Sequence, residues 1–118
     1  MKYMLLIHQG DAPTPGSDAW ESLSEDEKGA VYAAYKALNE APGFTAGVQM
    51  QPPETATTVR VQDGKTLTTD GPFVELKEAI GGYFFFEAAD LDAAIDVASK
   101  VPAASRGGWI EVRPLVAG

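Results

Sequence analysis

The stretch Thr69-Asp70-Gly71-Pro72-Phe73-Val74-Glu75 is the least generic run of residues in the chain, and the predicted strands are arranged around it. An Asp in a turn usually accepts a hydrogen bond from the backbone N–H two residues further on. Here that position is Pro72, which has no N–H. Asp70 therefore needs another partner: the N–H of Phe73, another segment, water or a ligand. Two interpretations stay open, a structural turn and a rigid loop that presents a carboxylate and an aromatic ring to a pocket.

A predicted β-hairpin leads into this corner. Residues 57–61 and 66–69 are rich in Thr and Val, which favour strands. Between them, Asp63-Gly64 predicts a two-residue turn, because such turns need a positive φ at both positions. The hairpin therefore delivers the chain directly to Asp70.

The most apolar strand follows the corner. Residues 74–80 predict at most a short helical turn, and Gly81-Gly82 lead into Tyr83-Phe84-Phe85-Phe86-Glu87. Side chains alternate between the two faces of a strand, so four consecutive aromatic residues place two rings on each face. Helices of the same chain can cover one face, and a partner subunit is the natural cover for the other. The run therefore predicts a homodimer.

The N-terminal half predicts a strand, a loop, a helix and a second strand. Residues 3–7 are a continuous apolar run, and the loop spans residues 11–18. A helix begins at Ser24, because Ser24 and Glu27 have the spacing of a capping box. Pro42-Gly43 ends that helix, and residues 44–51 form the second strand.

The C-terminal half has a similar order. Asp90 is placed to cap a helix, which ends at Val101-Pro102 and whose predicted apolar face contains Leu91, Ala94, Ile95 and Ala98. Residues 109–115 form the last strand, in which Trp109, Glu111 and Arg113 share one face. The order β-α-β, hairpin, β-α-β predicts an α+β, ferredoxin-like fold with an antiparallel sheet.

Composition limits the classes of function. The 118 residues fit a single domain, and the net charge of −8 disfavours binding to nucleic acid or to an anionic membrane. The apolar run at the N-terminus stops at His8, which is too early for a signal peptide, so we expect a cytoplasmic protein. With no Cys and one His, we predict no metal site. The two Gly-Gly pairs do not form a phosphate loop, and we predict no cofactor.

Ionisable and aromatic side chains are the candidates for a site. His8 is the one side chain whose unperturbed pKa lies near neutral pH, and we predict that it pairs with Asp70 for acid–base chemistry. Arg60 and Arg113 could grip an anionic ligand with their guanidinium forks; the alternative is surface ion pairing with Glu75 or Glu111. Aromatic side chains could line an apolar pocket or belong to the core or a dimer interface: Tyr32, Tyr35, Phe73, Tyr83, Phe84 and Phe86.

The run of residues 67–78 resembles the signature of the DGPF-type, YCII-related family. The opening residues 1–7, Gly81-Gly82-Tyr83, the helix start at residues 90–94 and the ending 110–114 are also similar to that family. The resemblance implies one YCII-related domain over residues 1–118 and ferredoxin-like subunits that pair into a dimeric α/β barrel. It also implies a His–Asp pair with the His on the first helix. The first helix of this chain has no His and carries Tyr32 and Tyr35 instead.

Two functions remain open. The wider superfamily includes small isomerases, monooxygenases and dechlorinating enzymes with pockets beside the sheet, so the first function is a dimeric binder or enzyme with a small-molecule pocket near Asp70. DGPF-type proteins are often linked with extracytoplasmic-function sigma factors. The second function is therefore a non-enzymatic accessory or regulatory module.

Overall fold

The computed structural model describes residues 1–14, 17–51, 55–70 and 80–117. Its elements, in chain order, are β1 (Lys2–His8), α1 (Asp18–Glu21), α2 (Glu25–Asn39), β2 (Phe44–Gln49), β3 (Thr57–Gln62), β4 (Lys65–Asp70), β5 (Ile80–Glu87), α3 (Leu91–Ser99), α4 (Pro102–Ser105) and β6 (Trp109–Pro114). Within the described ranges, no helix is long and apolar enough to cross a membrane.

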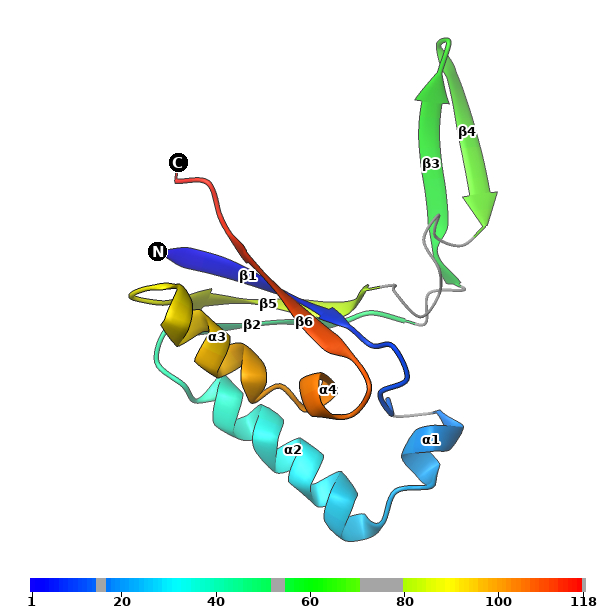
Figure 1. The fold of residues 1–118 in the computed structure, drawn as a ribbon. Coiled ribbons are helices and arrows are strands. Elements are labelled where there is room, and N and C mark those ends of the chain that lie inside the picture. The colour runs from blue at the N-terminus through cyan, green and yellow to red at the C-terminus, as the bar shows by residue number, and fades with distance from the viewer. Residues whose placement is uncertain (15–16, 52–54, 71–79, 118) are drawn as a thin grey trace.

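Four strands form one antiparallel sheet in the order β2-β5-β1-β6. The helices lie on one side of this sheet, and the β3–β4 hairpin stands away from it as a separate two-stranded sheet (Figure 1). The two β-α-β halves therefore interleave in the sheet, with the hairpin inserted between them. This arrangement confirms the predicted α+β, ferredoxin-like fold.

The core lies between the sheet and the helices. Directly paired residues of neighbouring strands point to the same face, and Leu5 pairs with both Phe84 and Val112. Leu5 is fully buried, and Phe84 is 4% exposed. The rest of this face and the helices contribute the other buried members of the cluster: Tyr3, Ile7, Leu38, Phe86, Ala88, Ala94, Val97, Ala98, Val101 and Ala103.

On the opposite face of the sheet, here called the open face, no helix formed by the described residues lies over the strands (Figure 1). The residues that the strand register assigns to the open face include Met4, Leu6, His8, Tyr83, Phe85, Trp109, Glu111 and Arg113. Tyr83 and Phe85 are half-buried, whereas Phe84 and Phe86 are buried. The aromatic residues of β5 thus alternate between the faces as expected, and cover of the open face by a second subunit stays a prediction.

Two local predictions are confirmed. Ser24 is the N-cap of α2, and both hydrogen bonds of its capping box with Glu27 are present. The hairpin turns at Asp63 and Gly64, with φ values of +53° and +76°, as a two-residue turn requires.

Strand boundaries differ from the predictions by two or more residues in two places. β2 ends at Gln49, two residues earlier than predicted, and Gly81-Gly82 lie inside β5 instead of before it. A Cβ at Gly82 would come within 2.8 Å of the Val48 carbonyl oxygen, and one at Gly81 within 2.3 Å of the Gln9 side chain. The two glycines therefore allow β2 and the end of β1 to approach β5 closely. The predicted turn over residues 74–80 otherwise lies outside the described residues.

The helices differ in three places. Leu91 and Ile95 are each half exposed, and the buried residues of α3 are Ala94, Val97 and Ala98. Small residues face the sheet here, which places the larger side chains on the flank of the helix. The other two differences are short helices that the sequence pattern missed: α1, at the end of the predicted loop, and α4, which begins at Pro102.

Candidate functional site

A cavity of about 320 Å³ lies on the helix side of the sheet. We call it the α2 pocket, because α2 provides Val31, Tyr32, Tyr35 and Asn39 to its lining. Residues of β2 and β5 border it, and the loop after β1 and the turn after α4 contribute Thr14 and Arg106. The lining is largely apolar, and Arg106 is its one charged side chain among the described residues.

Aromatic contacts build two walls of the α2 pocket. The Trp20 ring meets the Tyr32 ring edge-on, with centroids 5.4 Å apart and an interplanar angle of 77°. Phe44 of β2 packs on Phe84 of β5, with centroids 4.5 Å apart. Such ring pairs contribute about 0.5–1.5 kcal/mol beyond their buried area, so α1, α2 and the sheet stabilise these walls.

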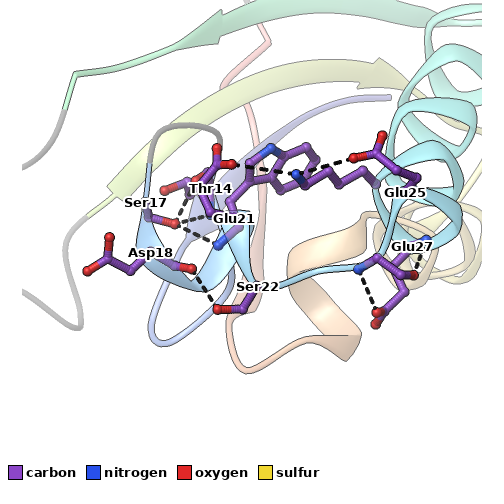
Figure 2. Close-up of polar contacts among 10 residues, drawn as sticks. Thr14, Ser17, Asp18, Glu21, Ser22, Glu25 and Glu27 are labelled. Atoms are coloured by element: carbon purple, nitrogen blue, oxygen red, sulfur yellow. Dashed lines mark hydrogen bonds and ion pairs between the residues drawn. The ribbon is translucent and has the colours of Figure 1, made fainter.

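Trp20 is held in this wall by the cap of α1. The Ser17 Oγ accepts hydrogen bonds from the backbone N–H groups of Thr14 and Trp20, both at 3.2 Å, and donates one to the Thr14 carbonyl at 2.6 Å (Figure 2). The Nζ of Lys28 in α2 also forms an ion pair with the Oε2 of Glu21 at a distance of 3.7 Å. The Ser17 hydroxyl and the Lys28–Glu21 ion pair therefore hold α1 against the pocket.

Tyr35 brings a hydroxyl group to the same lining. It is half-buried, and loss of solvent on burial raises its pKa above the ordinary value of 10.0. The phenol is therefore protonated throughout the neutral range and can both donate and accept a hydrogen bond.

A polar cluster lies on the open face. The His8 Nε2 is 3.3 Å from the Glu111 Oε1, and the His8 ring stacks on Trp109 with centroids 5.5 Å apart. Glu111 also accepts a hydrogen bond from the Arg113 guanidinium. Burial acts to raise the pKa of Glu111, but the hydrogen bonds from Arg113 and His8 together with their charges outweigh it, so the pKa lies below its ordinary value.

The sequence-predicted site residues lie in three regions. His8 and Arg113 meet through Glu111 on the open face. Tyr83 is assigned to the open face by the strand register and also contributes to the lining of the α2 pocket. Asp70 and Arg60 are exposed residues of the hairpin, and Phe73 lies outside the described residues. No described contact joins His8 to Asp70, whose pairing stays a prediction, and neither residue is among the described residues that line the pocket.

Several pocket residues were missed or only partly foreseen from the sequence. Tyr32, Tyr35, Tyr83 and Phe84, named above as residues of a pocket or of the core, all border the cavity, whereas Phe86 is buried in the core. Trp20 and Arg106 were missed because the sequence pattern did not predict the two four-residue helices. Trp20 belongs to α1, and Arg106 follows α4. Ser17 directly before Asp18 was the available signal, since Ser is a preferred N-cap. Within the described part of the chain, no group of three or more His, Asp or Glu is placed to hold a metal ion.

Comparison with known proteins adds a family to this geometry. The model of the YCII-related domain matches residues 1–117. An uncharacterised protein of Rhizobium meliloti (strain 1021) is 34% identical over 118 residues, which cover 98% of this chain and 92% of that protein. Because the family model spans almost the whole chain and agrees with the observed fold, the protein belongs to the YCII-related domain family.

Proposed function

We propose that the protein is a homodimer that binds a small, largely apolar molecule in the α2 pocket, with residues 1–118 acting as one domain. The observation that carries this proposal is the aromatic lining of the cavity by Trp20, Tyr32, Tyr35, Phe44 and Phe84. Its volume of about 320 Å³ is at the lower end of the range for ligand pockets in proteins. A ligand of up to three aromatic rings fits that size and surface.

We predict a small-molecule site near the Asp-Gly-Pro-Phe corner, and the position of the α2 pocket supports part of this prediction. Gly81 and Gly82 border the cavity and belong to the strand that the corner precedes in the chain. Binding by Asp70, Phe73, Arg60 or Arg113 and acid–base activity of His8 with Asp70 remain predictions from the sequence. Among described contacts, the carboxylate that reaches His8 is that of Glu111.

A neutral fluorescent probe tests the proposed function. N-phenyl-1-naphthylamine becomes fluorescent in apolar sites, and we expect saturable binding to the wild-type protein. Ala46 lines the cavity on β2, so Ala46→Phe should occupy part of it and weaken probe binding by about tenfold or more. Ala33→Phe adds the same ring to an exposed position of α2 outside the lining and should leave binding unchanged. Equal binding by all three proteins would contradict the proposal.

Native mass spectrometry of freshly purified protein tests for a natural ligand at the same site. A copurified small molecule should be lost in Ala46→Phe and retained in Ala33→Phe. The variant Asp70→Ala examines the corner separately. Loss of the adduct in Asp70→Ala as well would support a ligand that reaches the corner, and retention would count against Asp70 as a ligand-binding residue.

An accessory or regulatory module is the second candidate function, and the hairpin is the feature that favours it. Every residue of β3 and β4 except Thr58 is exposed, including Val59 at 59% and Val61 at 71%. Exposed apolar side chains on a projecting hairpin suit a protein partner, and the family resemblance suggests a link to a sigma factor. This function predicts that neither the probe nor a copurified ligand binds in the α2 pocket.

A further inference from the structure

Arg106 differs from every other described residue that lines the α2 pocket, because it alone carries a charge. The remaining lining consists of aromatic, aliphatic and small residues together with uncharged polar side chains such as Asn39 and Gln9. Arg106 is half-buried. A cation at the wall of an apolar cavity interacts with an enclosed anion more strongly than it would in open water, because the local dielectric is lower.

The backbone holds Arg106 at this wall. Arg106 is the C-cap of α4, and its N–H donates to the Ala103 carbonyl at 3.3 Å. The N–H of Gly108 donates to the same carbonyl at 2.9 Å, and the Gly107 carbonyl accepts from Asp11 N–H at 3.2 Å. Gly107 has a φ of +106°, which Gly adopts without steric cost. The turn is thereby fixed to the loop after β1, which also lines the pocket.

The charges around Arg106 leave it available to a ligand. Ion pairs between described residues use Lys28, Lys100, Arg113, His8 and the N-terminus, and Arg106 is in none of them. The hydrogen bonds with Ser24 lower the pKa of Glu27. Burial raises this pKa by a smaller amount, and the positive charge of Arg106 lowers it by the smallest amount. Glu27 is exposed, and no ion pair between described residues joins it to Arg106. The net charge of −8 means that the protein as a whole repels anions.

We propose that the α2 pocket selects small apolar molecules that carry one carboxylate, and that Arg106 binds this group. The proposal rests on the proposed function, since it names the ligand class of the same pocket. A guanidinium fork matches the planar carboxylate through two parallel N–H···O bonds. The aromatic walls take the apolar body of the ligand, and the protonated Tyr35 hydroxyl offers one more donor within the same lining.

Two matched probes separate this inference from the pocket itself. 8-Anilino-1-naphthalenesulfonate has the rings of N-phenyl-1-naphthylamine and one added anionic group. We expect the wild-type protein to bind both probes, and Arg106→Gln to weaken the sulfonate by about tenfold or more, because hydrogen bonds to charged groups are among the stronger ones. Binding of the neutral probe should stay within about twofold. Arg106→Lys should recover part of the sulfonate affinity.

Lys100→Gln is the matched control, because it removes one positive charge from α3 at an exposed residue outside the pocket lining. It should leave both affinities unchanged. If Lys100→Gln weakens the sulfonate as much as Arg106→Gln does, net charge explains the effect and the inference is wrong. If the neutral probe fails to bind the wild-type protein, the proposed function itself fails. If the neutral probe binds and Arg106→Gln leaves the sulfonate affinity intact, only the role of Arg106 fails.

Competition then tests the carboxylate itself. We expect 1-naphthaleneacetate to displace the bound sulfonate at concentrations about tenfold lower than 1-naphthaleneacetamide, which has the same rings without the charge. This difference should disappear in Arg106→Gln. Equal displacement by the acid and the amide in the wild-type protein would overturn the proposed ligand class.

Discussion

Glu111 shows how a single residue acquires its properties from its neighbours. Its Oε1 is 3.3 Å from His8 Nε2, and its other carboxylate oxygen accepts from Arg113. The side chain is 35% exposed, so solvent screens part of these interactions. The sequence pattern placed Glu111 and Arg113 on one face of the last strand and offered Glu111 as a partner of Arg113. It paired His8 with Asp70 instead, because the neighbour of β1 in the sheet was unknown.

The lowered pKa of Glu111 gives a pH prediction. The carboxyl has a lower pKa in the folded chain than its ordinary value of 4.5, so the charged form stabilises the fold at neutral pH. This stabilisation is lost as pH falls below about 4.5 and through the folded-state pKa. We expect wild type to have a higher Tm than Glu111→Gln at pH 7, with the difference shrinking as pH falls below about 4.5. Arg113→Gln, which removes one partner, should show the same convergence with smaller amplitude. A difference in Tm that is constant over this pH range would contradict the interpretation.

Short elements carry much of the pocket. α1 and α4 have four residues each, yet α1 contains Trp20 and α4 ends at the Arg106 turn. An isolated helix of this length is unstable in water, so both depend on packing against longer elements, and α1 also depends on its Ser17 cap. The β3–β4 hairpin differs from these short helices, because nearly all of its residues are exposed and it projects away from the four-stranded sheet (Figure 1). The radius of gyration of 16.1 Å exceeds the value of about 13.5 Å typical of a compact chain of this length.

The dependence of α1 on its cap can be measured. Ser17→Ala removes the acceptor for the Trp20 and Thr14 N–H groups, and loss of an N-cap typically costs about 1 kcal/mol of stability. Because Trp20 forms a wall of the α2 pocket, we expect weaker binding of N-phenyl-1-naphthylamine, read as an increase in Kd. Ser22→Ala is the matched control, since the Ser22 hydroxyl donates only to the Asp18 carbonyl at an exposed position. Unchanged binding in Ser17→Ala would show that the cap does not position the pocket wall.

The difference between the two faces of the sheet leads us to expect that two copies of the chain associate. The helix face is covered by the helices, whereas the open face presents Phe85 half-buried and Trp109 at 44% exposure. A face with this many aromatic side chains is typical of an interface between subunits. In the single chain Phe84 is buried, whereas its neighbour Phe85 is half-buried.

Substitution of these neighbours separates the core from the predicted interface. Phe84→Ala should lower the free energy of unfolding by about 3–5 kcal/mol, at any protein concentration and without altering the sedimentation coefficient of the folded protein. Phe85→Lys should instead convert a dimer to a monomer in sedimentation at micromolar concentration, because it places a charge in the interface. Ala33→Lys, at an exposed position of α2, should leave assembly unchanged. A wild-type monomer at micromolar concentration would rule out the dimer.

The sequence by itself determined the strands, the capping box, the hairpin turn and the α+β order, because each depends on contacts between residues near in the chain. Periodicity in β5 was enough to assign its aromatic side chains to two faces. Only the tertiary structure decided which residues meet across the sheet and around the cavity. Thus Glu111 lies beside His8, and Arg106 joins Trp20 and Phe44 in one pocket. These contacts depend on strand order and on the docking of short helices, and local propensity encodes neither of them.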